Sequence, residues 1–600
     1  MSLDRRTFIT STAGLAFLAS ATGLAQAAVA VQPEGSVKVR NRILRVGGRD
    51  VFYKHAGKGA PIVLIHSSPG DSSFWEDEIP ELAANYSVYA FDSPGFGRSE
   101  PPPETERDVG FMAERIAAAL KALGLPPAVI IGSHTGAAVG TELTVRHPQM
   151  VRGLMLDGIP VFSEHELENW FGDFLDPLTP EKRAGHFTTM WTRSRDQGIW
   201  FPWSINAPQQ LMPLRRLAGA QQIQRNMMRI MRSARTYLPE FRSAVFYAPR
   251  VPAALAAIEQ PTYIVCAKGD PLSPHMARLP PLKSNQTVEM LDGFMEIRER
   301  RAAWLPGVMG SVVAPPIVDK LPVDEGISGY IVELADGREV FLRVAGKPDK
   351  PALLLIHDAP GSSHMHRPLI EALSAHARVY AVDLPGCGET EPLSTQTPTI
   401  GDYAEIMRSV MTALGLRRAS VHGIGFGSSV ALELAARHPQ MVDKLVLQSV
   451  LLASAEDRAD MLAHYAPRIE LKADGSHWYT TWLMLRDSLV FWPWYKATGD
   501  RLRQVDIRDQ FEAIPLHDRT VEVMKQYGSY HHVINAALGQ DAQAVLKQIQ
   551  SKAVICTDAR HPFVGYDAAL VAGQPNAKQL QAAANGTDHV KQLAGLLGLK

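Results

Sequence analysis

The stretch Ala128–Gly140, AVIIGSHTGAAVG, decides the fold that this sequence predicts. It begins with a short apolar run typical of a buried parallel strand, and it ends with small and apolar residues at helical spacing. Between them lies the turn Gly132-Ser133-His134-Thr135-Gly136, whose glycines avoid clashes with a neighbouring strand and helix. A strand, a tight turn flanked by glycines and a helix are the context of a nucleophile elbow, Gly-x-Ser-x-Gly. The central position here is His134, because centring the turn on Ser133 would lose both glycines.

The chain contains two copies of one sequence unit. Motifs of the first half recur 291 positions later, and the glycine-flanked turn returns with Gly425 in the place of His134. His147-Pro148-Gln149-Met150-Val151 recurs unchanged at 438–442. The other matched sets are His66–Gly70 with His357–Gly361, Asp92–Gly97 with Asp383–Gly388, and Trp191, Arg195, Asp196, Pro202, Trp203 with Trp482, Arg486, Asp487, Pro493, Trp494. One spacing held over so many motifs indicates two fused copies.

Turn-forming residues are densest between the two copies, where Leu305-Pro306-Gly307 and Leu321-Pro322 occur. We therefore predict a first domain at 36–305, a linker at 306–325 and a second domain at 326–600. Each copy opens with alternating strands, and apolar runs then alternate with helical patterns. This order predicts an α/β fold, in which each domain is a mostly parallel, doubly wound sheet with right-handed crossovers.

The first 27 residues have the pattern of an export signal. Arg5-Arg6 precede an apolar stretch from Ala13 to Leu24, and Ala25-Gln26-Ala27 offers small residues to a signal peptidase. Paired arginines in this position resemble a twin-arginine signal, so we expect a periplasmic or secreted protein. No other segment is long and apolar enough to predict a membrane anchor.

Composition excludes several functional classes. A net charge of −1 over 600 residues gives no reason to expect nucleic acid or an acidic membrane as a partner. The cysteines are too few and too scattered for a disulfide framework or a zinc site. The second copy is rich in histidine, but no pair has helical metal-ligand spacing with a carboxylate, so a metal is a minority interpretation. We expect no cofactor and no metal, and a small-molecule substrate; packing of the two domains on each other stays open. The histidines are His357, His364, His366, His477, His561 and His589.

The His-x-x-Pro-Gly turn, the Asp-x-Pro-Gly-x-Gly loop and the elbow, in this order and repeated, resemble the α/β-hydrolase superfamily, specifically its lid-containing branch. The resemblance covers nearly all of the chain after the export signal, twice, and it is much more specific for the fold than for the reaction. It implies two tandem α/β-hydrolase-like domains. It also implies helical lids at about 162–250 and 451–544, where the pattern is helical and rich in aromatic residues.

The same resemblance implies a nucleophile, an acid and a histidine in that chain order. In the first copy Asp270 follows a late apolar strand and fits the acid, while Phe294 stands where the histidine is expected. The first copy thus carries His134 and Asp270 without a distal base. The backbone amides of Ser67 and Thr135 are expected to form an oxyanion hole.

The second copy departs further from the family pattern. Gly425 offers no nucleophile, and His561 stands at the position of the acid. His589, in the run Asn585–His589, fits the position of the family's histidine. Covalent catalysis is therefore improbable there, and we expect the second domain to be degenerate.

Two interpretations of His134 remain open. In one, the site has decayed and the chain is a catalytically silent binding or scaffolding protein. In the other, Asp270 fixes the tautomer of His134 and raises its basicity, so that the imidazole acts as a general base on a small ester, lactone or related carbonyl compound. We favour the second interpretation slightly, because only the first copy retains a paired histidine and aspartate.

Trp191, Arg195 and Trp203 are candidate substrate-binding residues in the first lid. Arg195 could hold a substrate carboxylate while the tryptophans form an apolar wall. The structural alternative is that Arg195 pairs with its neighbours and the aromatic side chains form the lid core. We favour that alternative, because both copies keep the motif although their elbows differ.

Overall fold

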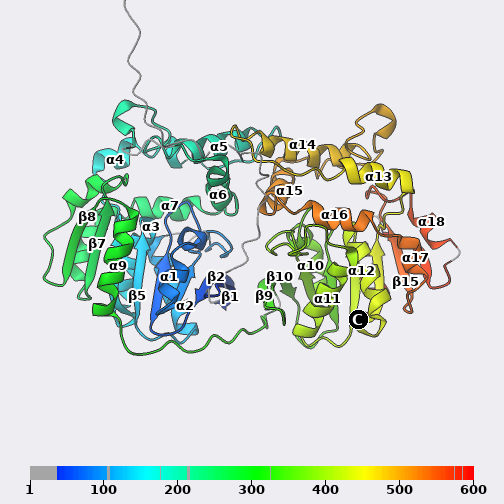
Figure 1. The fold of residues 1–600 in the computed structure, drawn as a ribbon, viewed down its shortest axis with the longest axis horizontal. Helices are drawn as coiled ribbons and strands as arrows, with labels where there is room; N and C mark the ends of the chain where they lie inside the picture. Colours follow the sequence, from blue (N-terminus) through cyan, green and yellow to red (C-terminus); the bar gives the residue numbers. More distant parts are fainter. Residues whose placement is uncertain are drawn as a thin grey trace, which may run out of the picture. The chain divides into compact units, whose positions relative to one another are not determined.

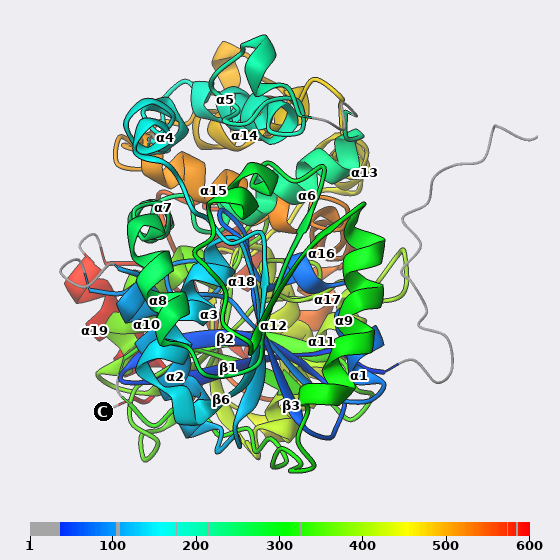
Figure 2. The ribbon, with the colours of Figure 1, turned by 90° about the vertical axis from the view of Figure 1, so that its left-hand side faces the viewer.

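The computed structural model describes residues 37–599 except 104–107, 176, 213–216, 325, 573 and 584–585. The expected export signal, residues 1–27, lies outside the described residues. Val37–Lys600 belong to one unit of the structure, which contains two eight-stranded sheets with helices on their faces (Figure 1, Figure 2). The predicted fold class, two tandem and mostly parallel α/β-hydrolase-like domains, is confirmed.

The two sheets have the same strand order. It is β1-β2-β4-β3-β5-β6-β7-β8 in copy 1 and β9-β10-β12-β11-β13-β14-β15-β16 in copy 2. The first two strands of each sheet pair antiparallel, the second pairs antiparallel with the third in the order, and the remaining pairs are parallel. The strands of copy 1 are β1 Arg40–Val46, β2 Arg49–Ala56, β3 Pro61–Ile65, β4 Ser87–Phe91, β5 Ala128–Ser133, β6 Val151–Asp157, β7 Thr262–Ala267 and β8 Gln286–Leu291. Those of copy 2 are β9 Ser328–Glu333, β10 Glu339–Ala345, β11 Ala352–Ile356, β12 Arg378–Val382, β13 Ala419–Ile424, β14 Val442–Gln448, β15 Ala553–Thr557 and β16 Ala577–Gln581.

Helices cover both faces of each sheet, which explains why the central strands β3 and β5 are buried along their whole length and, except for Ser133 at the end of β5, consist of apolar residues and glycine. The helices of copy 1 are α1 Ile79–Ala83, α2 Val109–Ala122, α3 Thr135–Arg146, α4 Glu164–Asn169, α5 Gly185–Asp196, α6 Ala220–Met231, α7 Leu238–Val245, α8 Val251–Ala257 and α9 Phe294–Val308. Those of copy 2 are α10 Arg367–Ser374, α11 Ile400–Ala413, α12 Phe426–Arg437, α13 Ala455–His464, α14 Ser476–Val490, α15 Ala513–Lys525, α16 His531–Leu538, α17 Ala542–Leu546, α18 Asp567–Val571 and α19 Gly586–Leu596.

A helical insertion interrupts each sheet. Helices α4–α8 lie between β6 and β7, and α13–α17 lie between β14 and β15. The two insertions contact each other through α5 with α14 and α6 with α15 (Figure 1). Phe187 and Trp478 stack there with ring centroids 5.2 Å apart, and both side chains are fully buried. Apolar packing therefore joins the two copies at the level of their insertions.

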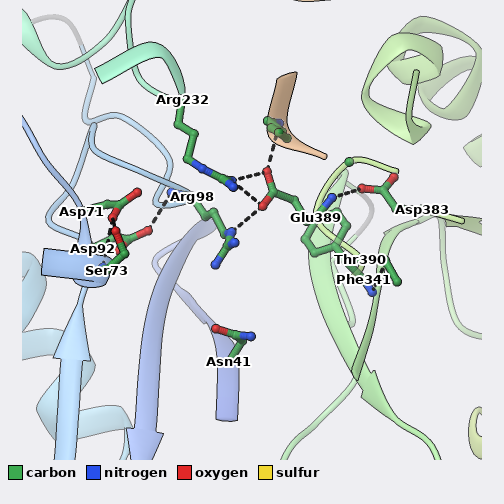
Figure 3. A network of polar contacts seen from close by, with 12 residues as sticks. Asn41, Asp71, Ser73, Asp92, Arg98, Arg232, Phe341, Asp383, Glu389 and Thr390 are labelled. Carbon is green, nitrogen blue, oxygen red and sulfur yellow. Dashed lines mark hydrogen bonds and ion pairs between the residues drawn. The ribbon is translucent and has the colours of Figure 1, made fainter. Parts of the chain in front are cut away.

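A buried cluster of ions joins the copies nearer to the sheets. The Glu389 carboxylate of copy 2 accepts hydrogen bonds from Arg98 (2.6 Å) and Arg232 (2.5 Å) of copy 1, and it pairs with Lys525 of copy 2 at 2.9 Å (Figure 3). Only 7% of the Glu389 side chain is exposed. Burial alone would raise the pKa of Glu389, but the three cations outweigh it and hold that pKa well below its ordinary value. Glu389 is thus an ionised carboxylate inside the molecule.

Arg98 and Glu389 occupy matching positions of the two copies. The backbone amide of Arg98 donates to Asp92 Oδ2 (2.8 Å), and that of Glu389 donates to Asp383 Oδ2 (3.0 Å). Each residue directly follows a glycine whose φ is 54° or 55°. The two copies therefore meet at equivalent points of their folds, and the charges there are opposite.

We expect Glu389→Gln to lower the free energy of unfolding by about 3–5 kcal/mol at pH 7, because Arg98 and Arg232 would lose the buried carboxylate they pair with and Lys525 would keep only Glu522. The folded-state pKa of Glu389 is depressed, so its contribution is complete above the unfolded-state pKa of about 4.3 and is lost as the pH falls through the folded-state value. Urea denaturation at pH 7 measures the first effect, and a series of denaturations from pH 5 down to pH 3 follows the second. The control Asp506→Asn removes an exposed pair with Arg508 and should leave the unfolding midpoint unchanged. An equal midpoint for Glu389→Gln and the wild type would contradict the prediction.

Candidate active site

The elbow of copy 1 presents His134 at a sharp bend between β5 and α3. His134 has φ 48° and ψ −107°, a conformation that non-glycine residues rarely adopt. The bend needs Gly136, because a Cβ atom there would lie 2.1 Å from the carbonyl oxygen of Ile65. Strain of this kind costs of order 1–3 kcal/mol and persists where the surrounding structure enforces it.

His134 and Asp270 form a direct pair. His134 Nε2 lies 2.9 Å from Asp270 Oδ2, and Asp270 Oδ1 accepts a hydrogen bond from the amide of Leu272 (2.8 Å). The Asp270 side chain is 4% exposed and that of His134 is 28% exposed, so the carboxylate lies behind the imidazole. Burial alone would lower the pKa of His134, but the charge of Asp270 and its hydrogen bond raise that pKa above the ordinary value. Burial would likewise raise the pKa of Asp270, and His134 lowers it instead.

A third ionisable group, Asp157, lies beside this pair and was missed by the sequence analysis. It is the last residue of β6, the neighbour of β5, and it is buried. Burial raises its pKa to about 7, an effect that His134 opposes and Asp270 reinforces. Gly158 follows with φ 63°, and a Cβ atom there would lie 2.6 Å from His134 Cδ2. The available signal was an aspartate and a glycine at the end of the strand that follows the elbow helix.

A mainly apolar cavity of about 60 Å³ opens beside His134. Ser68 and Thr135 line the cavity together with His134. The carbonyl oxygen of Ser67, by contrast, accepts a hydrogen bond from His66 Nδ1 (2.8 Å). Its remaining walls come mainly from the helical insertion: Pro160, Phe162, Phe171, Phe174, Phe201, Phe241, Ala244, Val245 and Leu272. A small ligand with a polar end toward His134 and an apolar end toward the phenylalanines fits these walls.

The three candidate substrate residues of the insertion do not line this cavity. Trp191 donates its indole N–H to the carbonyl oxygen of Ala473 in copy 2 (3.1 Å). Arg195 pairs with Asp196 at 2.6 Å. The guanidinium carbon of Arg193 lies over the Trp203 ring, 5.7 Å from the ring centroid. Phenylalanines from the same insertion supply the wall that these tryptophans were expected to form.

In copy 2 the elbow has the same bend, with Gly425 at φ 55° and ψ −124°. The carboxylate of Asp358 fills the space beside it, and His561 Nε2 lies 3.3 Å from Asp358 Oδ2. His589 lines a cavity of about 820 Å³ together with His366 and with Ile424, the residue before Gly425. The structure therefore places His561 within reach of the carboxylate beside the elbow, while His589 lines a cavity next to it.

In the part of the chain that the structure describes, no group of three or more histidine, cysteine, aspartate or glutamate side chains is arranged to hold a metal ion. Cys266, Cys387 and Cys556 are free and buried. No helix within the described ranges is long and apolar enough to cross a bilayer.

Comparison with known proteins gives one family. The model of the alpha/beta hydrolase fold matches residues 60–293 and 351–475, together more than half of the chain. The 2-hydroxymuconate semialdehyde hydrolase of Pseudomonas sp. (strain CF600) is 33% identical over 129 residues, which are 21% of this chain and 45% of that protein. Carboxylesterase YbfK of Bacillus subtilis (strain 168) is 34% identical over 140 residues, 23% of this chain and 46% of that protein. The chain thus spans about half the length of the curated relatives it matches.

Among solved structures, epoxide hydrolase A of Mycobacterium thermoresistibile aligns with a TM-score of 0.37 and 18% identity, over 46% of this chain and 100% of that chain. The family model matches one region in each copy, around the elbow that both copies share. The chain belongs to the alpha/beta hydrolase fold family, and it carries that fold twice.

Proposed function

We propose that copy 1 is a hydrolase for a small, largely apolar ester or lactone, with His134 as general base. The observation that carries this proposal is the pair of His134 Nε2 and Asp270 Oδ2, 2.9 Å apart, at the mouth of a cavity walled by phenylalanines. An imidazole whose pKa is raised by a carboxylate is a competent base near neutral pH. The two groups lie at the point where this family places its catalytic residues.

In the proposed reaction, His134 takes a proton from a water molecule as the water oxygen adds to the substrate carbonyl carbon. The carbonyl oxygen becomes an oxyanion and accepts hydrogen bonds from the amide of Thr135 and an amide of the Ser67-Ser68 turn. Asp270 holds the imidazolium ion in place. The tetrahedral intermediate then collapses and expels the alcohol oxygen, which takes the proton back from His134. One ester and one water thus give one acid and one alcohol.

The alternative is that the whole chain is a catalytically silent binding or scaffolding protein. For copy 2 we propose a silent, supporting role in either case. Gly425 has no side chain, and the Asp358 carboxylate occupies the space beside the elbow. No side chain at this elbow can therefore act as a nucleophile. Copy 2 would then support copy 1 through the buried ion cluster and the packed insertions.

We expect His134→Ala to reduce kcat/KM for a small aryl ester such as phenyl acetate by at least about 100-fold, the usual scale of general-base catalysis. Purified full-length protein and a spectrophotometric assay of phenol release suffice. His165→Ala, at an exposed position of the same insertion, is the matched control and should retain the wild-type rate. Equal rates in His134→Ala and the wild type would rule out the histidine mechanism and favour the silent alternative.

Asp270→Asn should move the acid limb of the pH profile of kcat/KM. The base acts when neutral, so the rate rises as the pH passes through the pKa of His134. Asp270 raises that pKa above the ordinary 6.5, and its removal should shift the limb to lower pH and lower the plateau about 10-fold or more. Rates measured between pH 5 and pH 9 test this. A limb that stays in place would show that His134 is not the group that titrates.

We also propose that the protein is exported by the twin-arginine route, which the arginine pair, the apolar stretch and the small residues at 25–27 support. Replacing Arg5 and Arg6 together by lysine should retain an uncleaved precursor in the cytoplasm. Cell fractionation and the mass of the product measure the outcome. Lys58→Arg is the matched control and should be exported normally. A normal periplasmic yield of the double variant would contradict this route.

A further inference from the structure

The centre of copy 2 has the backbone of an oxyanion hole. Ala359 and Phe426 lie 291 positions after Ser68 and Thr135, two residues that line the cavity of copy 1. The elbow residue between β13 and α12 has nearly the same φ and ψ as His134. Two amides that converge on one oxygen are the arrangement that stabilises an oxyanion. Copy 2 has therefore kept the anion-binding half of a hydrolase site.

This oxyanion hole is occupied by a side chain of the protein. Asp358 Oδ1 accepts hydrogen bonds from both amides, Ala359 N and Phe426 N, each at 2.8 Å. A Cβ atom on Gly425 would lie 2.0 Å from the same oxygen. The glycine at the elbow is thus a steric requirement of the carboxylate. Any other residue there would push the carboxylate out of the hole.

The apolar half of the copy 2 site is filled as well. Four residues that line the copy 1 cavity are each matched in copy 2 by an aromatic residue with a larger side chain. These rings contact one another with centroids 5.2–5.7 Å apart, which leaves them packed as a cluster. The matched pairs are Thr135 with Phe426, Phe174 with Tyr465, Phe201 with Trp492, and Leu272 with Phe563.

Charge around the hole selects a carboxylate. Burial would raise the pKa of Asp358, but His561 and the Phe426 amide lower it, so the side chain stays ionised. Arg519 interacts electrostatically with Asp358, and its Nη1 is buried without a hydrogen-bond partner among the described residues. Copy 1 has Met228 at the position that matches Arg519. The second copy thus combines two amides with a guanidinium group at a position where the first copy has a methionine.

We propose that the centre of copy 2 is a binding site for small aromatic carboxylates, which the Asp358 carboxylate and the Phe426 ring hold shut from inside. Asp358 stands in for the carboxylate of the ligand, and the ring cluster stands in for its aromatic group. In the native chain the side chains of Asp358 and of the ring cluster fill the site. This site is distinct from the hydrolase site of copy 1, so it does not depend on the activity proposed there.

The test opens the site with the residues of copy 1. The full-length variant Asp358→Ser/Phe426→Thr carries the copy 1 residues at both positions, which clears the hole and part of the ring cluster. We expect it to bind one equivalent of benzoate more than the wild type, with a Kd of about 1 mM or lower, as measured by isothermal titration calorimetry and by fluorine NMR with 4-fluorobenzoate. Circular dichroism and the thermal midpoint establish that the variant is folded.

Two further variants separate this site from nonspecific binding. Asp358→Asn keeps a side chain of the same shape in the hole, so it should gain no benzoate site. Adding Arg519→Met to the opened variant removes the cation and should weaken the added site at least 10-fold. No added equivalent in the folded opened variant would overturn the proposal, and so would an added equivalent in Asp358→Asn or one that Arg519→Met does not weaken. A benzoate site at copy 2 of the wild type would also overturn the proposal, because the proposal has the native site held shut.

Discussion

The arrangement of this protein depends on one buried carboxylate, Glu389, held by cations of both copies. A carboxylate is buried at a large desolvation cost unless opposite charges surround it, and here Arg98, Arg232 and Lys525 do so. Arg98 and Glu389 hold the same place in their respective copies. Two identical first copies meeting in this way would bring arginine against arginine, and two second copies would bring glutamate against glutamate. The opposite charges thus favour the pairing of unlike copies, and the packed insertions build on it.

The active-site geometry of copy 1 follows from the backbone more than from the side chains. The bend at His134 requires glycine two residues later, and the imidazole needs the bare backbone of Gly158 beside it. Within that frame the ring reaches Asp270 at the end of the next but one strand. Asp157 is buried beside His134 and Asp270, and burial raises the pKa of its carboxyl to about 7. The site therefore places one imidazole among two carboxyl groups that titrate differently.

Much of this was accessible from the sequence because it is local or repeated. The repeat of 291 residues and the glycine-flanked turn predicted two α/β domains, and the short segment after β7 placed Asp270. The cavity walls were not accessible, because they come from insertion helices whose packing only the tertiary structure defines. The motif around Trp191 is visible in the sequence because both copies keep it. Its tryptophan packs over Gly475 of the other copy, where a Cβ atom would lie 2.4 Å from Trp191 Cγ.

The glycine of the second elbow and the carboxylate of Asp358 beside it constrain each other. Any mutation that restores a side chain at 425 must first meet an oxygen of Asp358 within 2.0 Å. Removal of the side chain at 358 empties the oxyanion hole and takes from Arg519 the anion that it interacts with. Positions 358 and 425 are therefore coupled, since a side chain at 425 requires a change at 358.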